Sequence, residues 1–277
     1  MEIAPSAHMG LVELSVSDID RSIEYWQRAI GLRVLSRENG TAELGADTPL
    51  LRFVEEPGAR PADGFTGLYH VALLVPDRPA LGRFLRHVAD ERVPVEGASD
   101  HAVSEAIYFR DPDRHGIEVY ADRPRAEWEG KVFERMTTMP MDVDGVIASA
   151  DGPFDGLPDG TTVGHVHLRV RDVDETVGFY HGLVGMGVMA QLGDSAAFLS
   201  AGGYHHHLGA NVWESRGAPP APPGTATLRH ATIVLPDEAE QRRIADAVGG
   251  GEEREDGILV RDPSGNPLLL TRSSAAS

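Results

Sequence analysis

The chain has 277 residues, of which 41% are hydrophobic and 25% charged, so it can bury a full core. Asp and Glu total 43 against 25 Lys and Arg, and the net charge of −18 argues against nucleic acid or an anionic membrane as a partner. The absence of cysteine excludes disulfides and thiolate chemistry. Neither a signal-peptide pattern nor a membrane-spanning apolar run is visible, so we expect a cytoplasmic protein.

One pattern occurs four times along the chain: a run of alternating apolar and polar residues that ends in an aspartate. Such alternation predicts a half-buried strand, and the segment after each aspartate predicts a short helix. The copies occupy residues 11–18, 70–77, 165–172 and 230–237, and all but the first begin with histidine. We expect the terminal aspartates to cap their helices: Asp18, Asp77, Asp172 and Asp237.

Each copy is followed by further strand patterns, which predicts four βαβββ units. Helices are expected at about 20–30 and 78–89, and strands at about 32–37, 40–44, 50–54, 104–110, 117–120, 204–212 and 268–270. The prediction is an α+β fold with units at 1–62, 63–124, 163–216 and 225–272, and with a surface linker at 125–162.

Four such units, with histidine at the head of the first strand and an Asp-Pro turn before the last, resemble the vicinal oxygen chelate superfamily. Within it, the four-module group of glyoxalases and extradiol (catechol 2,3-dioxygenase-like) ring-cleaving enzymes is most similar. The resemblance implies modules that pair, so that each pair curves a sheet into a barrel-like cup with a divalent metal at its base. Because the superfamily supports several reactions, the site residues must decide the activity.

The resemblance also implies that strand-head histidines and one late carboxylate bind the metal. In units two and three these residues are His70, Glu118 and His165, and two imidazoles with one carboxylate suit non-haem Fe(II). Unit four has His230 but Leu269 where the carboxylate is expected. We therefore predict that units two and three pair to form the active cup. Units one and four would form a second cup without metal.

The same resemblance assigns roles to further residues. His206 would accept a proton from a bound diol, although the register leaves open whether His205, His206 or His207 faces the site. Tyr108 would hydrogen-bond the metal-bound substrate oxygen, and His167 and His207 would line the substrate pocket. The remaining histidines are expected in loops, at the surface or as a remnant of the repeat: His8, His101, His115, His181 and His230.

The implied function is a metal-dependent extradiol dioxygenase that cleaves a catechol-like aromatic diol with O₂. Its metal would be Fe(II), with Mn(II) or another divalent ion as alternatives, and the protein is expected to form a homo-oligomer. A glyoxalase-type isomerase or lyase and a non-catalytic, resistance-type binding protein are competing hypotheses. The sequence leaves the substrate, the metal, the module pairing and the oligomeric state open.

Overall fold

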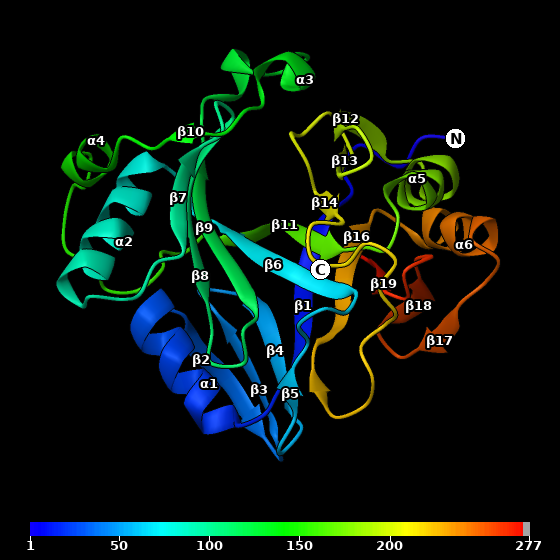
Figure 1. The fold of residues 1–277 in the computed structure, drawn as a ribbon, viewed down its shortest axis with the longest axis horizontal. Coiled ribbons are helices and arrows are strands. Elements are labelled where there is room, and N and C mark those ends of the chain that lie inside the picture. Colours follow the sequence, from blue (N-terminus) through cyan, green and yellow to red (C-terminus); the bar gives the residue numbers. More distant parts are fainter. Residues whose placement is uncertain (274–277) are drawn as a thin grey trace.

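The computed structural model describes residues 1–273 and has two large mixed sheets (Figure 1). The eight-stranded sheet combines strands from the two ends of the chain, in the order β17-β18-β19-β16-β1-β4-β3-β2. Its strands are β1 (His8–Val16), β2 (Arg33–Glu38), β3 (Thr41–Gly45), β4 (Pro49–Glu55), β16 (Leu228–Leu235), β17 (Glu252–Arg254), β18 (Gly257–Arg261) and β19 (Pro267–Arg272).

The nine-stranded sheet is built from the middle of the chain and curls into a half-barrel (Figure 1). Its order is β10-β7-β8-β9-β6-β11-β14-β13-β12. The strands are β6 (Gly67–Leu74), β7 (Gly97–Asp100), β8 (Ser104–Arg110), β9 (Gly116–Asp122), β10 (Met139–Pro140), β11 (Thr162–Arg169), β12 (Gly187–Leu192), β13 (Ala196–Ser200) and β14 (Leu208–Asn211). A small separate sheet pairs β5 (Arg60–Pro61) with β15 (Thr225–Ala226).

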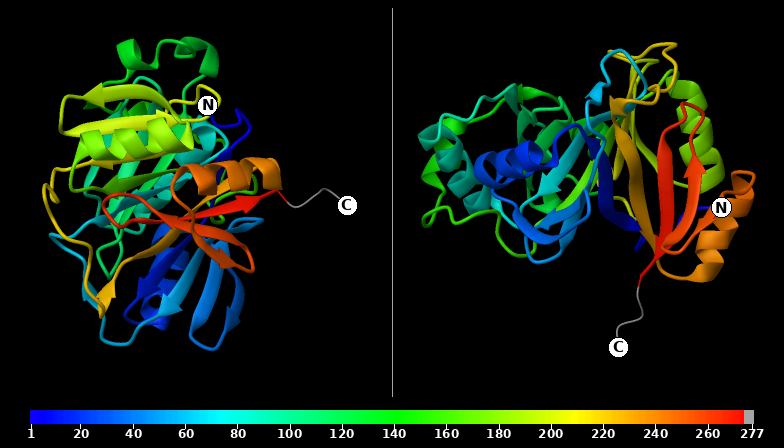
Figure 2. Two further views of the ribbon diagram at one scale, coloured as in Figure 1. Left: turned by 90° about the vertical axis from the view of Figure 1, so that its right-hand side faces the viewer. Right: turned by 90° about the horizontal axis from the view of Figure 1, so that it is seen from below.

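The second and third units therefore share one sheet, and the first and fourth share the other, as the placement of the histidines and the carboxylate predicted. Two antiparallel pairs make these joins: β6 with β11, and β1 with β16. In the left view of Figure 2, the blue and red strands from the two ends of the chain lie together below the green strands of the middle.

Each unit carries its helix where the sequence predicted it, directly after the first strand. The predicted caps are confirmed, because each of the four aspartates accepts a hydrogen bond from a backbone N–H in the first helical turn. The helices are α1 (Ile19–Tyr25), α2 (Arg78–Asp90), α5 (Val173–Val177) and α6 (Glu238–Ala247), with wider-turn continuations of α1 over Trp26–Ile30 and of α5 over Gly178–Val184. Within residues 1–273, no helix combines the length and apolar character needed to cross a membrane.

Buried polar contacts join the two sheets at the Asp-Pro turn before β9. The Trp26 indole nitrogen donates to Asp111 at 3.1 Å, and the backbone N–H of Ser17 donates to Asp113 at 2.8 Å. A matching contact occurs in the other half, where the Tyr180 hydroxyl donates to Asp262 at 3.3 Å. These turns thus link each unit to a unit in the other sheet.

Three expectations about the chain outside the strand–helix units are corrected. His8 does not lie in a loop, because it begins β1, although its side chain is exposed. His115 is buried rather than at the surface, and its Nε2 lies 2.9 Å from the Ser15 carbonyl oxygen of the other sheet. Residues 125–162 are more than a wrapping linker: they form a 3₁₀ turn (Arg125–Glu127), α3 (Val132–Arg135), β10 and α4 (Val143–Ala148).

The cap of α2 gives a test of the local folding rules. Asp77 accepts from the Ala80 N–H at 2.8 Å, so Asp77→Ala should lower the free energy of unfolding by about 1 kcal/mol, measured by urea denaturation. Asp77→Asn keeps an acceptor oxygen and should retain most of that stability. Equal losses in the two variants would contradict the assigned cap.

Candidate metal centre

Three buried side chains of the nine-stranded sheet converge on one point: His70 of β6, Glu118 of β9 and His165 of β11. Glu118 Oε2 lies 2.9 Å from His70 Nε2 and 3.2 Å from His165 Nε2. The two Nε2 atoms are 3.3 Å apart. Ligand atoms that surround one ion at right angles and about 2.1 Å from it are about 3 Å from one another, so the spacing fits a single transition-metal ion.

The sheet register produces this convergence. Strand β6 lies between β9 and β11, and Ala72 is the cross-strand partner of Glu118 on one side and of His165 on the other. Since side chains alternate between the two faces of a strand, His70 shares the face of Ala72. The methyl group of Ala72 leaves room between the three larger side chains.

The charge states of the three groups suit cation binding. Burial alone would raise the pKa of Glu118, but the contacts with His165 and His70 outweigh it and hold that pKa well below its usual range. Burial lowers the pKa of His165 to about 4. Near pH 7 the site therefore holds a carboxylate and a neutral imidazole, and these ligands bind a cation without first losing a proton.

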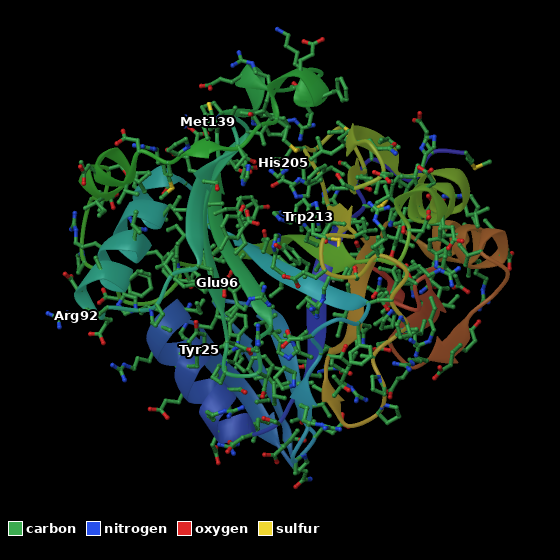
Figure 3. The ribbon with its side chains drawn as sticks, viewed as in Figure 1. Tyr25, Arg92, Glu96, Met139, His205 and Trp213 are labelled. Atoms are coloured by element: carbon green, nitrogen blue, oxygen red, sulfur yellow. The ribbon has the colours of Figure 1, made fainter. Side chains whose placement is uncertain are left out.

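His206 lies against the metal centre and is connected to a chain of hydrogen bonds behind it. Its ring centroid is 4.0 Å from that of His165, and its Nδ1 is 2.8 Å from Nδ1 of His205. His205 Nε2 lies 2.9 Å from Asp122 Oδ1, which also accepts from the Tyr204 hydroxyl at 3.2 Å. Figure 3 shows His205 on the inner side of the curled sheet.

These contacts form one hydrogen-bond chain. A carboxylate oxygen accepts hydrogen bonds, so in the tautomer with a single ring hydrogen His205 donates from Nε2 to Asp122 and accepts at Nδ1. His206 must then donate from its own Nδ1, which leaves a lone pair on its Nε2. Burial lowers the pKa of His206 well below its usual range, so this ring is neutral.

Tyr108 has a partner that we did not predict as part of the site. Its hydroxyl is 2.7 Å from Nε2 of His101, and His101 Nδ1 is 2.8 Å from the carbonyl oxygen of Thr137. A carbonyl only accepts, so in the tautomer with its hydrogen on Nδ1, His101 donates to Thr137 and accepts the Tyr108 hydrogen at Nε2. Burial and the charge of Glu118 raise the pKa of Tyr108 well above its usual range, which keeps the phenol protonated.

The residues around the centre line one cavity of about 740 Å³. The lining includes all three candidate ligands, together with His206, Tyr108, His101 and His167. His167 is the cross-strand partner of His70, and Gly209 allows its position, since a Cβ there would lie 2.9 Å from the ring. His207 is not among the lining residues: its Nδ1 accepts from the Ala201 N–H at 3.1 Å.

The family is identified by the pattern of the whole chain. The Glyoxalase/Bleomycin resistance protein/Dioxygenase superfamily matches residues 8–119 and 162–270. The chain belongs to this superfamily. A relative described as a catechol-2,3-dioxygenase of Bacillus subtilis (strain 168) is 41% identical over 275 residues, which span 94% of this chain and 95% of that protein.

Solved structures of superfamily members support the same fold. A putative dioxygenase from Bacillus subtilis subsp. subtilis str. 168 has a TM-score of 0.66 at 15% identity. The match covers 98% of this chain and 86% of that protein. Glyoxalase I from Zea mays has a TM-score of 0.61 at 19% identity, with coverages of 96% and 92%. At these identities the likeness concerns the fold alone.

In the eight-stranded sheet, His230 takes the strand position that His70 and His165 take in the other sheet, but its neighbouring side chains differ. His230 is buried, its Nδ1 is 3.8 Å from Glu13 Oε1, and Leu269 lies on the neighbouring strand β19. Within residues 1–273, one cluster of three potential ligands is spaced for a metal, namely that of His70, Glu118 and His165. Leu269 occupies on β19 the register position that Glu118 occupies on β9, because each lies opposite the residue two places after the strand histidine.

Two participants in the site escaped sequence reasoning, for different reasons. His101 follows β7 in a loop, so no strand periodicity could orient it. Asp122 closes β9 four residues after Glu118, and that spacing on one strand face was a usable signal.

Metal content tests the centre directly. His70→Ala, Glu118→Ala and His165→Ala should each reduce the iron bound per chain to less than about a tenth of wild type, because each removes one of three ligands. His230→Ala is the matched control, since it removes a buried histidine from the equivalent strand of the other sheet, and it should keep full metal content. Anaerobic loading with Fe(II) followed by elemental analysis gives the readout, and an unchanged His165→Ala protein would refute the site.

Proposed function

We propose that this protein is an extradiol ring-cleaving dioxygenase that acts on a catechol-like aromatic diol with O₂. The observation that carries the proposal is the buried pair of histidines with one carboxylate at the inner end of a large cavity. The 41% identical relative, described as a catechol-2,3-dioxygenase, favours this reaction over a glyoxalase-type isomerase and over a non-catalytic binding protein.

The proposed metal ligands are His70, His165 and Glu118, and the proposed ion is Fe(II), with Mn(II) or another divalent ion as the alternative. These residues would hold the ion and would leave room in the cavity for the diol and for dioxygen, and the bound ion would supply the redox chemistry that links the ring to oxygen. Both oxygen atoms of O₂ enter the product, so the reaction needs no external reductant.

His206 is the proposed base. In the tautomer set by His205 and Asp122, its Nε2 can take a proton from a diol hydroxyl, while Nδ1 keeps its hydrogen bond to His205. Asp122 then stabilises the resulting positive charge through His205, with no movement of heavy atoms. His205 and Asp122 are positioning residues in this proposal, since neither lines the cavity.

Tyr108 is the proposed partner of a substrate oxygen, as the resemblance implied. Its hydroxyl lines the cavity, 2.7 Å from Nε2 of His101, where it can hydrogen-bond a diol oxygen. His167, on the same wall, is the proposed contact for the face of the ring.

We also propose that the four units are copies of one module, because each has the element order βαβββ. The proposed boundaries are 1–62, 63–124, 163–216 and 225–272, with 125–162 as a connection that adds to the active cup. The two large sheets would then be the two paired-module, barrel-like domains. Assembly into a homo-oligomer remains a prediction.

Turnover of catechol under air tests the function. Iron-loaded wild type should convert catechol to a yellow ring-opened product with uptake of one O₂ per ring. His206→Asn should lower kcat about 100-fold or more and keep its iron, because it removes the base but no ligand. His181→Asn, at an exposed helical position, is the control and should match wild type. A loaded wild type that binds catechols without consuming O₂ would instead support a binding protein.

Asp122→Asn tests the hydrogen-bond chain behind His206. The amide keeps the shape but removes the negative charge that steadies a protonated His206, so we expect kcat to fall about tenfold with KM little changed. Stopped-flow and steady-state assays on iron-matched samples give the comparison. A tenfold rise in KM with unchanged kcat would show that Asp122 affects substrate binding rather than proton transfer.

A further inference from the structure

The cavity extends well beyond the space that a single diol ring needs. Its volume of about 740 Å³ falls in the range of ~300–1,000 Å³ that is usual for drug-sized ligands. The candidate ligands occupy its inner end, because they lie on the central strands β6, β9 and β11. A diol bound there leaves the outer part of the cavity for a substituent.

The outer part is lined by large apolar side chains that are unusually exposed. Phe133 of α3 is 72% exposed, Leu192 at the end of β12 is 56% exposed, and Trp213 after β14 is 52% exposed. They come from three separate elements yet line the same cavity, and clustered exposed apolar groups of this kind mark binding surfaces. Figure 3 shows Trp213 beside the opening of the curled sheet.

Packing fixes the Trp213 ring and the segment that carries Phe133. The Trp213 ring meets Tyr69 edge-on at a centroid distance of 5.4 Å and contacts His167 at 5.6 Å. The segment that carries Phe133 is anchored by buried Trp128 and Val132, which pack with Val103 before β8. The apolar rim is therefore a built part of the cavity wall, formed before a substrate arrives.

The charges around the cavity exclude an acidic substituent. Among the described residues that line it, Arg110 is the one Lys or Arg, and its Nε is 2.9 Å from Glu96. Glu214 Oε1 also lies 3.7 Å from Nη2 of Arg110, so the positive charge of Arg110 is already neutralised. Apart from the proposed metal ion, which the diol occupies, a substrate carboxylate would find no unpaired cation among the lining residues and would face Glu96 instead, and burying it unpaired is costly.

We propose that the substrate is an uncharged catechol with a bulky apolar substituent, such as an aryl or branched alkyl group, and that catechols with a carboxylate side chain are rejected. This inference rests on the proposed function for the orientation of the diol. The rim of Phe133, Leu192 and Trp213 holds the substituent, and the paired state of Arg110 provides the discrimination against acids.

A pair of ligands that differ by one negative charge and one methyl group tests the inference: 3-(3,4-dihydroxyphenyl)propionate and its methyl ester. The dissociation constants are measured by calorimetry on the iron-loaded protein without oxygen, and kcat/KM is measured in air. We expect the ester to bind at least tenfold more tightly than the acid, and 4-phenylcatechol to exceed catechol by a similar factor.

Variants of the rim locate the effect. Trp213→Ala and Leu192→Ser should each lower the ratio of kcat/KM for phenylcatechol over catechol about three- to tenfold. The control Leu183→Ser removes a leucine of 42% exposure that does not line the cavity, and its ratio should stay at the wild-type value.

The outcomes separate the two proposals. If no catechol is oxidised but the ester still binds more tightly than the acid, the oxygenase function fails and the ligand class stands. Equal affinity for acid and ester, tighter binding of the acid, or no binding of either overturns the ligand class, whatever the turnover of catechol itself.

Discussion

The pairing of β6 with β11 is the constraint on which the site depends. It is the seam of the nine-stranded sheet, and it brings His165 next to Ala72, across from Glu118 on β9. His70 and His165 are 95 residues apart in the chain, yet their Nε2 atoms are 3.3 Å apart. A shift of this register by one residue would turn His165 to the opposite face and abolish the cluster.

Burial sets the charge states of the side chains at the site. An isolated carboxylate as deeply buried as Glu118 would protonate, and the contacts with two imidazoles keep it ionised. The same burial lowers the pKa of His165, His167 and His206, so these three rings are neutral near pH 7. The result is a single negative charge among neutral nitrogen donors, which a divalent cation complements.

The two sheets share a plan but differ in what fills their inner faces. In the nine-stranded sheet, the inward positions carry the metal-binding set and open into a cavity. In the eight-stranded sheet, the face that carries His230 and the buried Leu269 also carries Glu13 and Arg52, which form ion pairs. One fold can thus supply a reactive cup and a supporting one, since the scaffold does not itself determine the chemistry.

The sequence by itself determined the repeated strand–helix units, the four capping aspartates and the three residues that could bind a metal. The units and the caps follow from local periodicity and residue types, and the three metal residues follow from the resemblance to the vicinal oxygen chelate superfamily. The pairing of units two and three could be inferred only because together they carry a complete set of candidate ligands.

The tertiary structure alone decided which of the three consecutive histidines faces the cavity, that His101 contacts Tyr108, and that Asp122 lies behind His205. Those contacts involve loops without periodicity and segments far apart in the chain. It also decided the apolar outer wall, because residues 125–140 carry no strand pattern and only their packing through Trp128 and Val132 turns them toward the cavity.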